Sequence, residues 1–336
     1  MRNFVILLIL SGFSFSAFSQ TTEENITKID WNAYSQIRFE TNFNDNHNFL
    51  LRRLKIWIKS APDFSEHWSF KVQTTVSSLK NESFFLQDAK LAYKTGIWSF
   101  DIGQFVPEYS LQRFQSDYLL PVTERAKVIN SLIPNGTLGV RDIGIQANIK
   151  TKNNVLQTHF GIFNGYGIKE YRLSNKGVLL TNKSELNLKT GTGAIKAGYS
   201  VMFRKADNQI YPKIMPDTIL YSGNDFRYNL FLLYKTKFFE IQGEYLTAVF
   251  DNNQHSEGYY IMSAINLKKH QIVLAYEDYK DIISSSSDLP YYHIGYNYLI
   301  NNHKIKLFFD NDFQITNNTI QNYEASVQLQ VFFKQN

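Results

Sequence analysis

Residues 88–105 read DAKLAYKTGIWSFDIGQF, and polar and apolar side chains alternate on both sides of a break at residues 94–96. A period of two is typical of a β-strand, and the break at Gly96 indicates a short turn between two antiparallel strands. The apolar face of this hairpin must lie against either a protein core or lipid. It consists of Ala89, Leu91, Tyr93, Trp98, Phe100 and Ile102.

The same alternation recurs along the chain in segments of about ten residues. Further segments are 31–39, 49–55, 68–77, 142–149, 154–163, 194–203, 226–235, 238–247, 258–267, 271–280, 291–300, 304–312 and 323–333. Single-chain bacterial barrels usually have an even number of strands. The weakly patterned stretch 178–190 is therefore predicted to hold one more strand, which brings the total to about sixteen.

The composition of the two faces favours lipid over a protein core. One face is rich in Trp, Phe, Tyr and Ile, whereas Lys, Gln, Asp, Ser and Thr occupy the other. Short connections alternate with long ones at 107–137, 165–188 and 204–224, which is typical of a transmembrane antiparallel β-barrel with long extracellular loops. About sixteen strands would enclose a water-filled lumen. A soluble exported β-sandwich with an aromatic core, which binds a carbohydrate or another partner, is the alternative.

The N-terminus predicts export. A basic start at Arg2 precedes the apolar run 4–10, and Ala17-Phe18-Ser19 fits a signal-peptide cleavage site. We therefore expect a signal peptide over residues 1–19 and one barrel domain over 20–336. Beyond the signal, no apolar stretch reaches the ~20 residues of a spanning helix. The expected location is the outer membrane of a Gram-negative bacterium, in contact with its lipid.

Charge and composition argue against several other functions. The net charge is only +5, without a basic block that would bind nucleic acid. The chain has no cysteine, and its seven histidines are scattered without the spacing of metal ligands. We therefore expect no enzyme activity, no cofactor and no metal.

Several segments resemble, in order, the phosphate-selective porin O and P family of Gram-negative outer membranes. They are FLLRRLK (49–55), LQDAKLAY (86–93), IGQF (102–105) before Pro107, Glu124-Arg125, GVRDIG (139–144), FNG (163–165) and VQLQVFF (327–333). The resemblance implies a sixteen-stranded trimeric porin whose third long loop folds inward and narrows the pore. The segment 107–137 is the candidate for this loop.

The family resemblance also implies that basic side chains along the lumen attract anions. Arg52 and Arg53 match a pair of family arginines, and strand alternation predicts that only Arg53 faces the lumen. Gln104 and Val106 stand where relatives often carry lysine, which favours general or weakly anion-preferring diffusion over a phosphate-specific pore. The predicted pore-lining residues are Arg38, Arg53, Lys55, Lys71, Asp88 and Lys90, and those of the constriction loop are Arg113, Arg125 and Lys127.

The predicted function is a water-filled outer-membrane channel for small hydrophilic solutes, with a preference for anions such as phosphate. The predicted partners are these solutes and further copies of the chain in a homotrimer, or other outer-membrane proteins. A structural barrel subunit of a larger outer-membrane complex, with a plugged lumen, is the alternative function.

Overall fold

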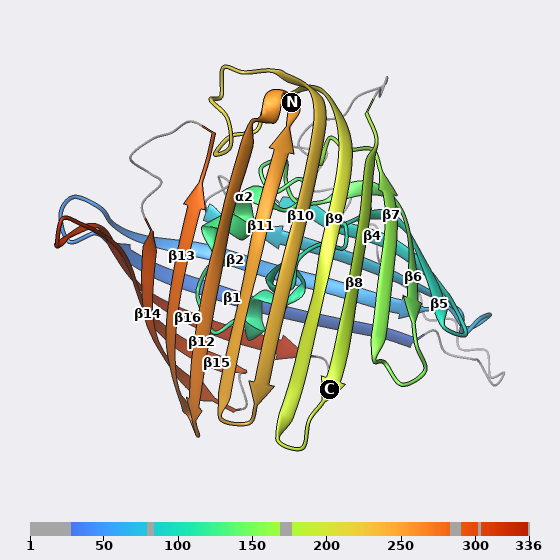
Figure 1. Cartoon of the computed structure of the whole chain (residues 1–336). Helices are drawn as coiled ribbons and strands as arrows, with labels where there is room; N and C mark the ends of the chain where they lie inside the picture. The colour runs from blue at the N-terminus through green and yellow to red at the C-terminus, as the bar shows by residue number, and fades with distance from the viewer. Residues whose placement is uncertain (1–27, 79–83, 169–176, 283–289, 302–303, 335–336) are drawn as a thin grey trace, which may run out of the picture.

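Sixteen antiparallel strands close into one barrel in the computed structural model, which describes residues 28–78, 84–168, 177–282, 290–301 and 304–334 (Figure 1). The strands are β1 (Lys28–Thr41), β2 (His47–Ala61), β3 (Trp68–Val76), β4 (Phe84–Thr95), β5 (Trp98–Phe105), β6 (Asp142–Lys150), β7 (Leu156–Phe163), β8 (Leu179–Lys189), β9 (Gly193–Gln209), β10 (Tyr221–Thr236), β11 (Phe239–Phe250), β12 (His255–Leu267), β13 (His270–Lys280), β14 (Tyr291–Ile300), β15 (Ile305–Thr316) and β16 (Thr319–Lys334). Each strand pairs with its sequence neighbours, and β1 pairs with β16 to close the sheet. The predicted fold class and strand number are confirmed.

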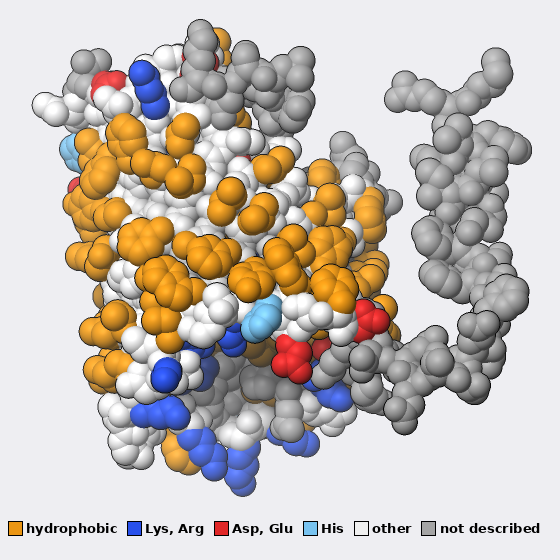
Figure 2. Space-filling view, turned by 90° about the vertical axis from the view of Figure 1, so that its right-hand side faces the viewer, with side chains coloured by type: hydrophobic (Ala, Val, Ile, Leu, Met, Phe, Trp, Pro, Cys, Tyr) orange, Lys and Arg blue, Asp and Glu red, His pale blue; other side chains and the backbone are white. Residues whose placement is uncertain are grey.

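The apolar face of the strands lies on the outside of the barrel. In the hairpin of β4 and β5, Leu91 is opposite Ile102 and both are exposed, whereas Asp88 and Asp101 face inward and are buried. Figure 2 shows the result as a broad band of hydrophobic side chains across the face in view. Alternation therefore places the lipid-facing and lumen-facing side chains as predicted.

The strand predicted within 178–190 is β8, which pairs with β7 and β9 along its length. The long loop predicted at 204–224 is wrong in extent, because β9 continues to Gln209 and β10 begins at Tyr221. Arg204 and Asp225 are directly opposite each other in these strands and form a buried ion pair at 2.5 Å. Arg204 and Gln209, which lie within the predicted loop, are thus buried residues of a longer strand β9.

The segment 106–141 between β5 and β6 folds into the barrel and fills one side of its lumen (Figure 1). It contains the short helices η2 (Gln112–Phe114), η3 (Asp117–Leu119) and α2 (Lys127–Leu132). Buried Ile129 and Leu132 of α2 belong to an apolar cluster with Met202 and Met262 of the barrel wall. The main hydrophobic core is therefore inside the barrel, between this loop and the wall.

The helices of the barrel are short. None in the described ranges has the length and the apolar character to cross a membrane. The predicted signal peptide, residues 1–19, lies outside the described residues.

Candidate functional site

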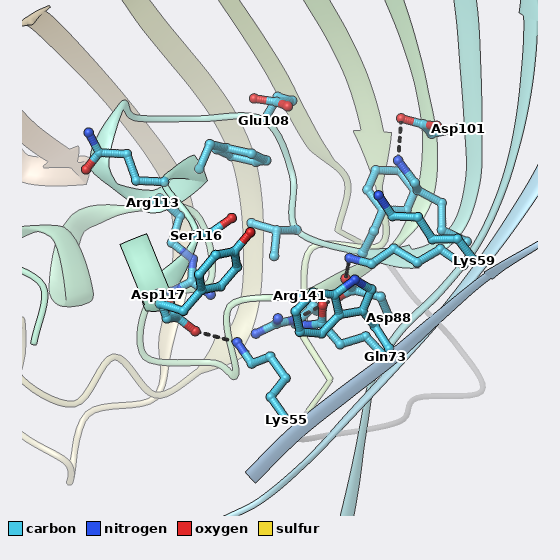
Figure 3. Close-up of a pocket in the computed structure, with 18 of the residues that line it drawn as sticks. Lys55, Lys59, Gln73, Asp88, Asp101, Glu108, Arg113, Ser116, Asp117 and Arg141 are labelled. Carbon is cyan, nitrogen blue, oxygen red and sulfur yellow. Dashed lines mark hydrogen bonds and ion pairs between the residues drawn. The ribbon is translucent and has the colours of Figure 1, made fainter. Parts of the chain in front are cut away.

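A cavity of about 320 Å³ remains between the inward-folded loop and the wall of β1 to β6 (Figure 3). We call it the constriction pocket. The residues of the wall strands that point into this cavity lie at alternate positions along their strands, and the loop contributes residues in and around η2 and η3. The charged side chains that line it are Lys55, Lys59, Lys71, Asp88, Lys90, Asp101, Glu108, Arg113, Asp117, Arg125 and Arg141.

Asp117 is the point where the loop meets the basic wall. Its carboxylate contacts Lys55 Nζ and Arg125 Nη1, lies 2.9 Å from Arg53 Nη1, and accepts a hydrogen bond of 3.0 Å from Tyr34 Oη. Burial alone would raise the pKa of Asp117, but the surrounding cations hold it well below its usual range. The carboxylate is therefore charged and neutralises part of the basic cluster.

Glu124 makes a second contact between loop and wall, with two arginines of β2. Contrary to prediction, Arg52 points into the lumen as well as Arg53. The register with β1 shifts, so that Gln36 is opposite Arg53 and Ile37 is opposite Leu51, and Arg52 lies in a β-bulge. Arg52 Nη2 is 2.7 Å and Arg53 Nη2 is 3.6 Å from Glu124 Oε2.

Further ion pairs lie on the wall itself. Asp88 of β4 binds Lys71 Nζ of β3 at 2.6 Å and Arg141 Nε, at the end of the loop, at 3.1 Å. Lys90 Nζ binds Asp101 of β5 at 3.0 Å. Each acidic residue therefore holds a lysine or arginine in place beside the open space (Figure 3).

The pocket retains an excess of positive charge. Seven basic and four acidic side chains line it. Within the described part of the chain, neither Arg113 nor Lys59 has a carboxylate at ion-pair distance, although both line the pocket. Arg113 Nε is buried without a hydrogen-bond partner there. Both residues therefore add positive charge to the pocket without an acidic partner among the described residues.

The loop is fixed on the opposite wall by hydrogen bonds to its backbone. The Glu244 carboxylate on β11 accepts the N–H groups of Leu111 at 2.9 Å and Gln112 at 2.7 Å. Arg227 Nη1 on β10 donates to the carbonyls of Leu132 at 3.1 Å and Ile133 at 3.0 Å. The position of the constriction therefore depends on both sides of the barrel.

Two predicted residues lie away from the constriction pocket. Arg38 faces the lumen but is buried under the loop, where it contacts Glu40 and Glu124 at 2.8 and 2.7 Å. Lys127 lines a second cavity of about 250 Å³ on the other side of the loop, with its Nζ 2.9 Å from the ring centre of Tyr291. Of the other predicted residues, Lys55, Lys71, Asp88, Lys90, Arg113 and Arg125 line the constriction pocket. Arg53 does not line it but contacts Asp117, which does.

Gln104, whose identity argued against a phosphate pore, does not face the pore. It shares the outward face of β5 with Ile102, and its side-chain amide donates to the carbonyls of Leu86 and Gln87 at 2.9 and 3.0 Å. These carbonyls lie beside a second bulge, between β3 and β4. The difference from relatives at this position therefore concerns the outer surface of the barrel.

The sequence interpretation missed the roles of Arg52, Lys59 and Arg141 in this site. The only sequence feature that pointed to Arg141 was the Arg141-Asp142 pair at the end of the loop. In the described residues, no group of three or more His, Asp or Glu side chains is arranged to hold a metal ion.

Comparison with known proteins agrees with this geometry. A family model described as phosphate-selective porin O and P matches residues 27–269. No curated protein sequence matches the chain.

Solved porins share the fold. OmpF of Salmonella typhi, in complex with daunomycin, is 11% identical with a TM-score of 0.66 over 94% of this chain and 100% of that chain. OprB of Pseudomonas putida is 10% identical, with a TM-score of 0.61 over 92% of this chain and 94% of the OprB chain. OmpT of Vibrio cholerae in its trimer form is 10% identical, with a TM-score of 0.59 over 91% of this chain and 99% of the OmpT chain. At such low identity these likenesses concern the fold alone.

Proposed function

The chain belongs to the phosphate-selective porin O and P family, and we propose that it prefers anions because of the charges in its constriction pocket. A member of this family is an outer-membrane porin, a channel rather than an enzyme, through which small hydrophilic solutes diffuse. The proposal concerns the residues that select among those solutes.

The excess of basic side chains in the pocket carries the proposal. Fixed positive charge beside a narrow aqueous path attracts anions and repels cations. Arg113 and Lys59 have no carboxylate partner in the described residues, so they are the first candidates to contact a passing anion. A guanidinium can bind a phosphate through two parallel hydrogen bonds.

The acidic residues keep this binding weak. Asp117, Asp88 and Asp101 each neutralise neighbouring basic groups. A channel needs sites that are favourable enough to attract a solute and weak enough to release it. Lys55, Lys71 and Lys90 on successive strands then offer an anion several alternative contacts along the wall.

Solute flux into liposomes tests this proposal. The mature chain is reconstituted, and swelling rates are compared for an organic anion, an organic cation and a neutral sugar of similar mass. We expect the anion to enter fastest and the cation slowest. Equal rates for the anion and the cation would contradict the role of the pocket charges while leaving the channel intact.

We also propose that the protein assembles as a homotrimer. Support comes from the family resemblance and from the trimeric form of one porin with the same fold. Native mass spectrometry in mild detergent gives the copy number directly. A monomer that retains full solute flux would contradict the trimer but not the channel.

A further inference from the structure

The end of the barrel with the short turns carries a ring of lysines that lies outside the constriction pocket. Five exposed lysines lie within the turns, and five more lie at the adjoining strand ends. The turn lysines are Lys152, Lys237, Lys268, Lys269 and Lys304, and the strand-end lysines are Lys94, Lys150, Lys189, Lys235 and Lys334. Figure 2 shows lysine and arginine side chains gathered at the lower end of the molecule.

The charge of this ring is largely uncompensated, although Lys235 Nζ pairs with Glu240 at 2.5 Å. The exposed acids described at the same end are only Asp30, Asp63 and Glu66. Within the described residues, none of the five turn lysines has a carboxylate at ion-pair distance, and Lys237 Nζ instead lies 5.5 Å from the ring centre of Phe238.

The opposite end of the barrel has mixed charge. Its exposed acids in the described ranges are Asp45, Asp217, Asp251 and Glu324. Its exposed lysines there are Lys205, Lys213 and Lys280 outside the lumen and Lys127 on the inward-folded loop. Among the residues that the structure describes, the excess of lysine is therefore specific to the short-turn end.

Large apolar side chains adjoin the ring on the outer surface. Trp98 is 42% exposed, Leu267 is 52% exposed and Phe238 is 65% exposed. Trp and other aromatic residues mark the level where hydrocarbon gives way to lipid headgroups. Lysines just beyond that level can keep their stems against the apolar band and extend their ammonium groups among the headgroups.

We propose that this lysine ring binds the phosphate-bearing headgroups of anionic glycerophospholipids in the leaflet that it faces. The inference depends on the membrane placement of the porin, in which the short turns lie on the periplasmic side. Ammonium groups near an anionic lipid surface are attracted to it, and the attraction weakens with salt. The position beside the apolar band favours lipid over a solute or an acidic protein.

Bromine-labelled lipids test the proposal in the full mature chain. Bromine quenches tryptophan fluorescence on contact, and Trp31 and Trp98 are exposed on the outer surface near the short-turn end. The protein is reconstituted in phosphatidylcholine vesicles that contain either brominated phosphatidylglycerol or brominated phosphatidylcholine. We expect an apparent preference for phosphatidylglycerol of about threefold or more at low salt, which declines in high salt.

Variants assign the preference to the ring. Replacing all five turn lysines with glutamine (Lys152→Gln, Lys237→Gln, Lys268→Gln, Lys269→Gln and Lys304→Gln) should bring the two lipids close to parity, whereas arginine at the same positions should preserve the preference. The matched control Lys205→Gln, Lys213→Gln and Lys280→Gln at the other end should leave it unchanged.

Three results would overturn the proposal. They are equal binding of both lipids by the parent protein, an unchanged preference in the glutamine variant, and an equal loss in the control. Ion current is recorded from the same preparations. If the glutamine substitutions changed ion selectivity but not lipid preference, the ring would serve the channel mouth instead. Loss of current with lipid preference intact would contradict the porin function and not this inference.

Discussion

At the scale of single residues, Asp117 neutralises part of the basic cluster to which we attribute the proposed anion preference. Its carboxylate neutralises Arg53, Lys55 and Arg125 together. Removing one partner from a buried ion pair leaves the other charge uncompensated and costs about 3–5 kcal/mol. Its replacement should therefore change both the selectivity of the channel and the stability of the loop.

We predict that Asp117→Asn makes the channel more anion-selective. The zero-current potential across a planar bilayer in a salt gradient measures this change. Asp63→Asn is the control, because it removes one acidic charge from an exposed turn outside the lumen. An identical potential in parent and Asp117→Asn would show that the charges around Asp117 do not face the ion path.

Arg113 and Arg38 should differ in effect although both are lumen-facing arginines. Arg113 has no carboxylate partner within the described residues and lines the pocket, whereas Arg38 is buried in contacts with Glu40 and Glu124. We expect Arg113→Gln to lower the anion preference, with Arg38→Gln leaving it nearly unchanged. Permeability ratios from the same bilayer measurement compare them, and a larger loss in Arg38→Gln would reverse the assignment.

Residue positions were predictable where the strands are regular. Lys55, Lys71 and Lys90 follow from alternation alone. Arg52 was not predictable, because the bulge between β1 and β2 inserts one residue and lets two consecutive arginines reach Glu124. Gln104, by contrast, was predictable from alternation, because it has the parity of the outward-facing Ile102, and its amide donates to the backbone carbonyl of Leu86.

At the scale of elements, the inward-folded loop is held by apolar contacts as well as by ion pairs. Ile129 and Leu132 of α2 are fully buried against the wall. Truncating a buried Ile or Leu to Ala costs about 2–5 kcal/mol. Such a loss should release the loop without opening the barrel, because each strand retains its two neighbours.

We predict that Ile129→Ala with Leu132→Ala gives a larger and noisier single-channel conductance. The control Ile145→Ala with Ile162→Ala removes the same kind of atoms from the outer surface, where the parent side chains are 54% and 61% exposed. Conductance equal to that of the parent in the loop variant would mean that the loop does not limit the pore.

Glu124 should stabilise the loop even in mild acid. Burial would raise its pKa, but Arg52 and Arg53 lower it from 4.5 to about 2. A carboxylate with a depressed pKa contributes its full stability above its ordinary pKa and loses it as pH falls through the depressed value. The contribution should therefore decline between pH 4.5 and pH 2.

Thermal unfolding of the parent and Glu124→Gln, followed by tryptophan fluorescence, checks this prediction. We expect the parent to be more stable at pH 7, and the difference to persist near pH 4.5 and vanish toward pH 2. A difference that is already absent at pH 5 would contradict the ion pairs of Glu124 with the arginines.

The strands were more predictable than the loop. A period of two identified β4 and β5 because each of their faces meets a uniform environment. The sequence of residues 106–141 has no comparable period. Its path depends on contacts with Glu244 and Arg227, which are far away in sequence. Only the family resemblance predicted that this segment folds inward.

At the scale of the whole molecule, the barrel combines an apolar exterior with a charged, partly filled interior. Its hydrophobic band requires lipid or detergent, and the loop leaves a basic pocket on the side of β1 to β6 (Figures 2 and 3). The proposed anion preference follows from this combination, because the charged pocket is lined by both the barrel wall and the loop.

The zero-current potential of the unmodified protein in a planar bilayer with a potassium chloride gradient tests the central claim most directly. We predict discrete single-channel currents with a potential whose sign reports preferential chloride passage. A potential of the opposite sign would contradict the proposed role of the basic pocket. A folded preparation that carries no ion current would contradict the channel itself.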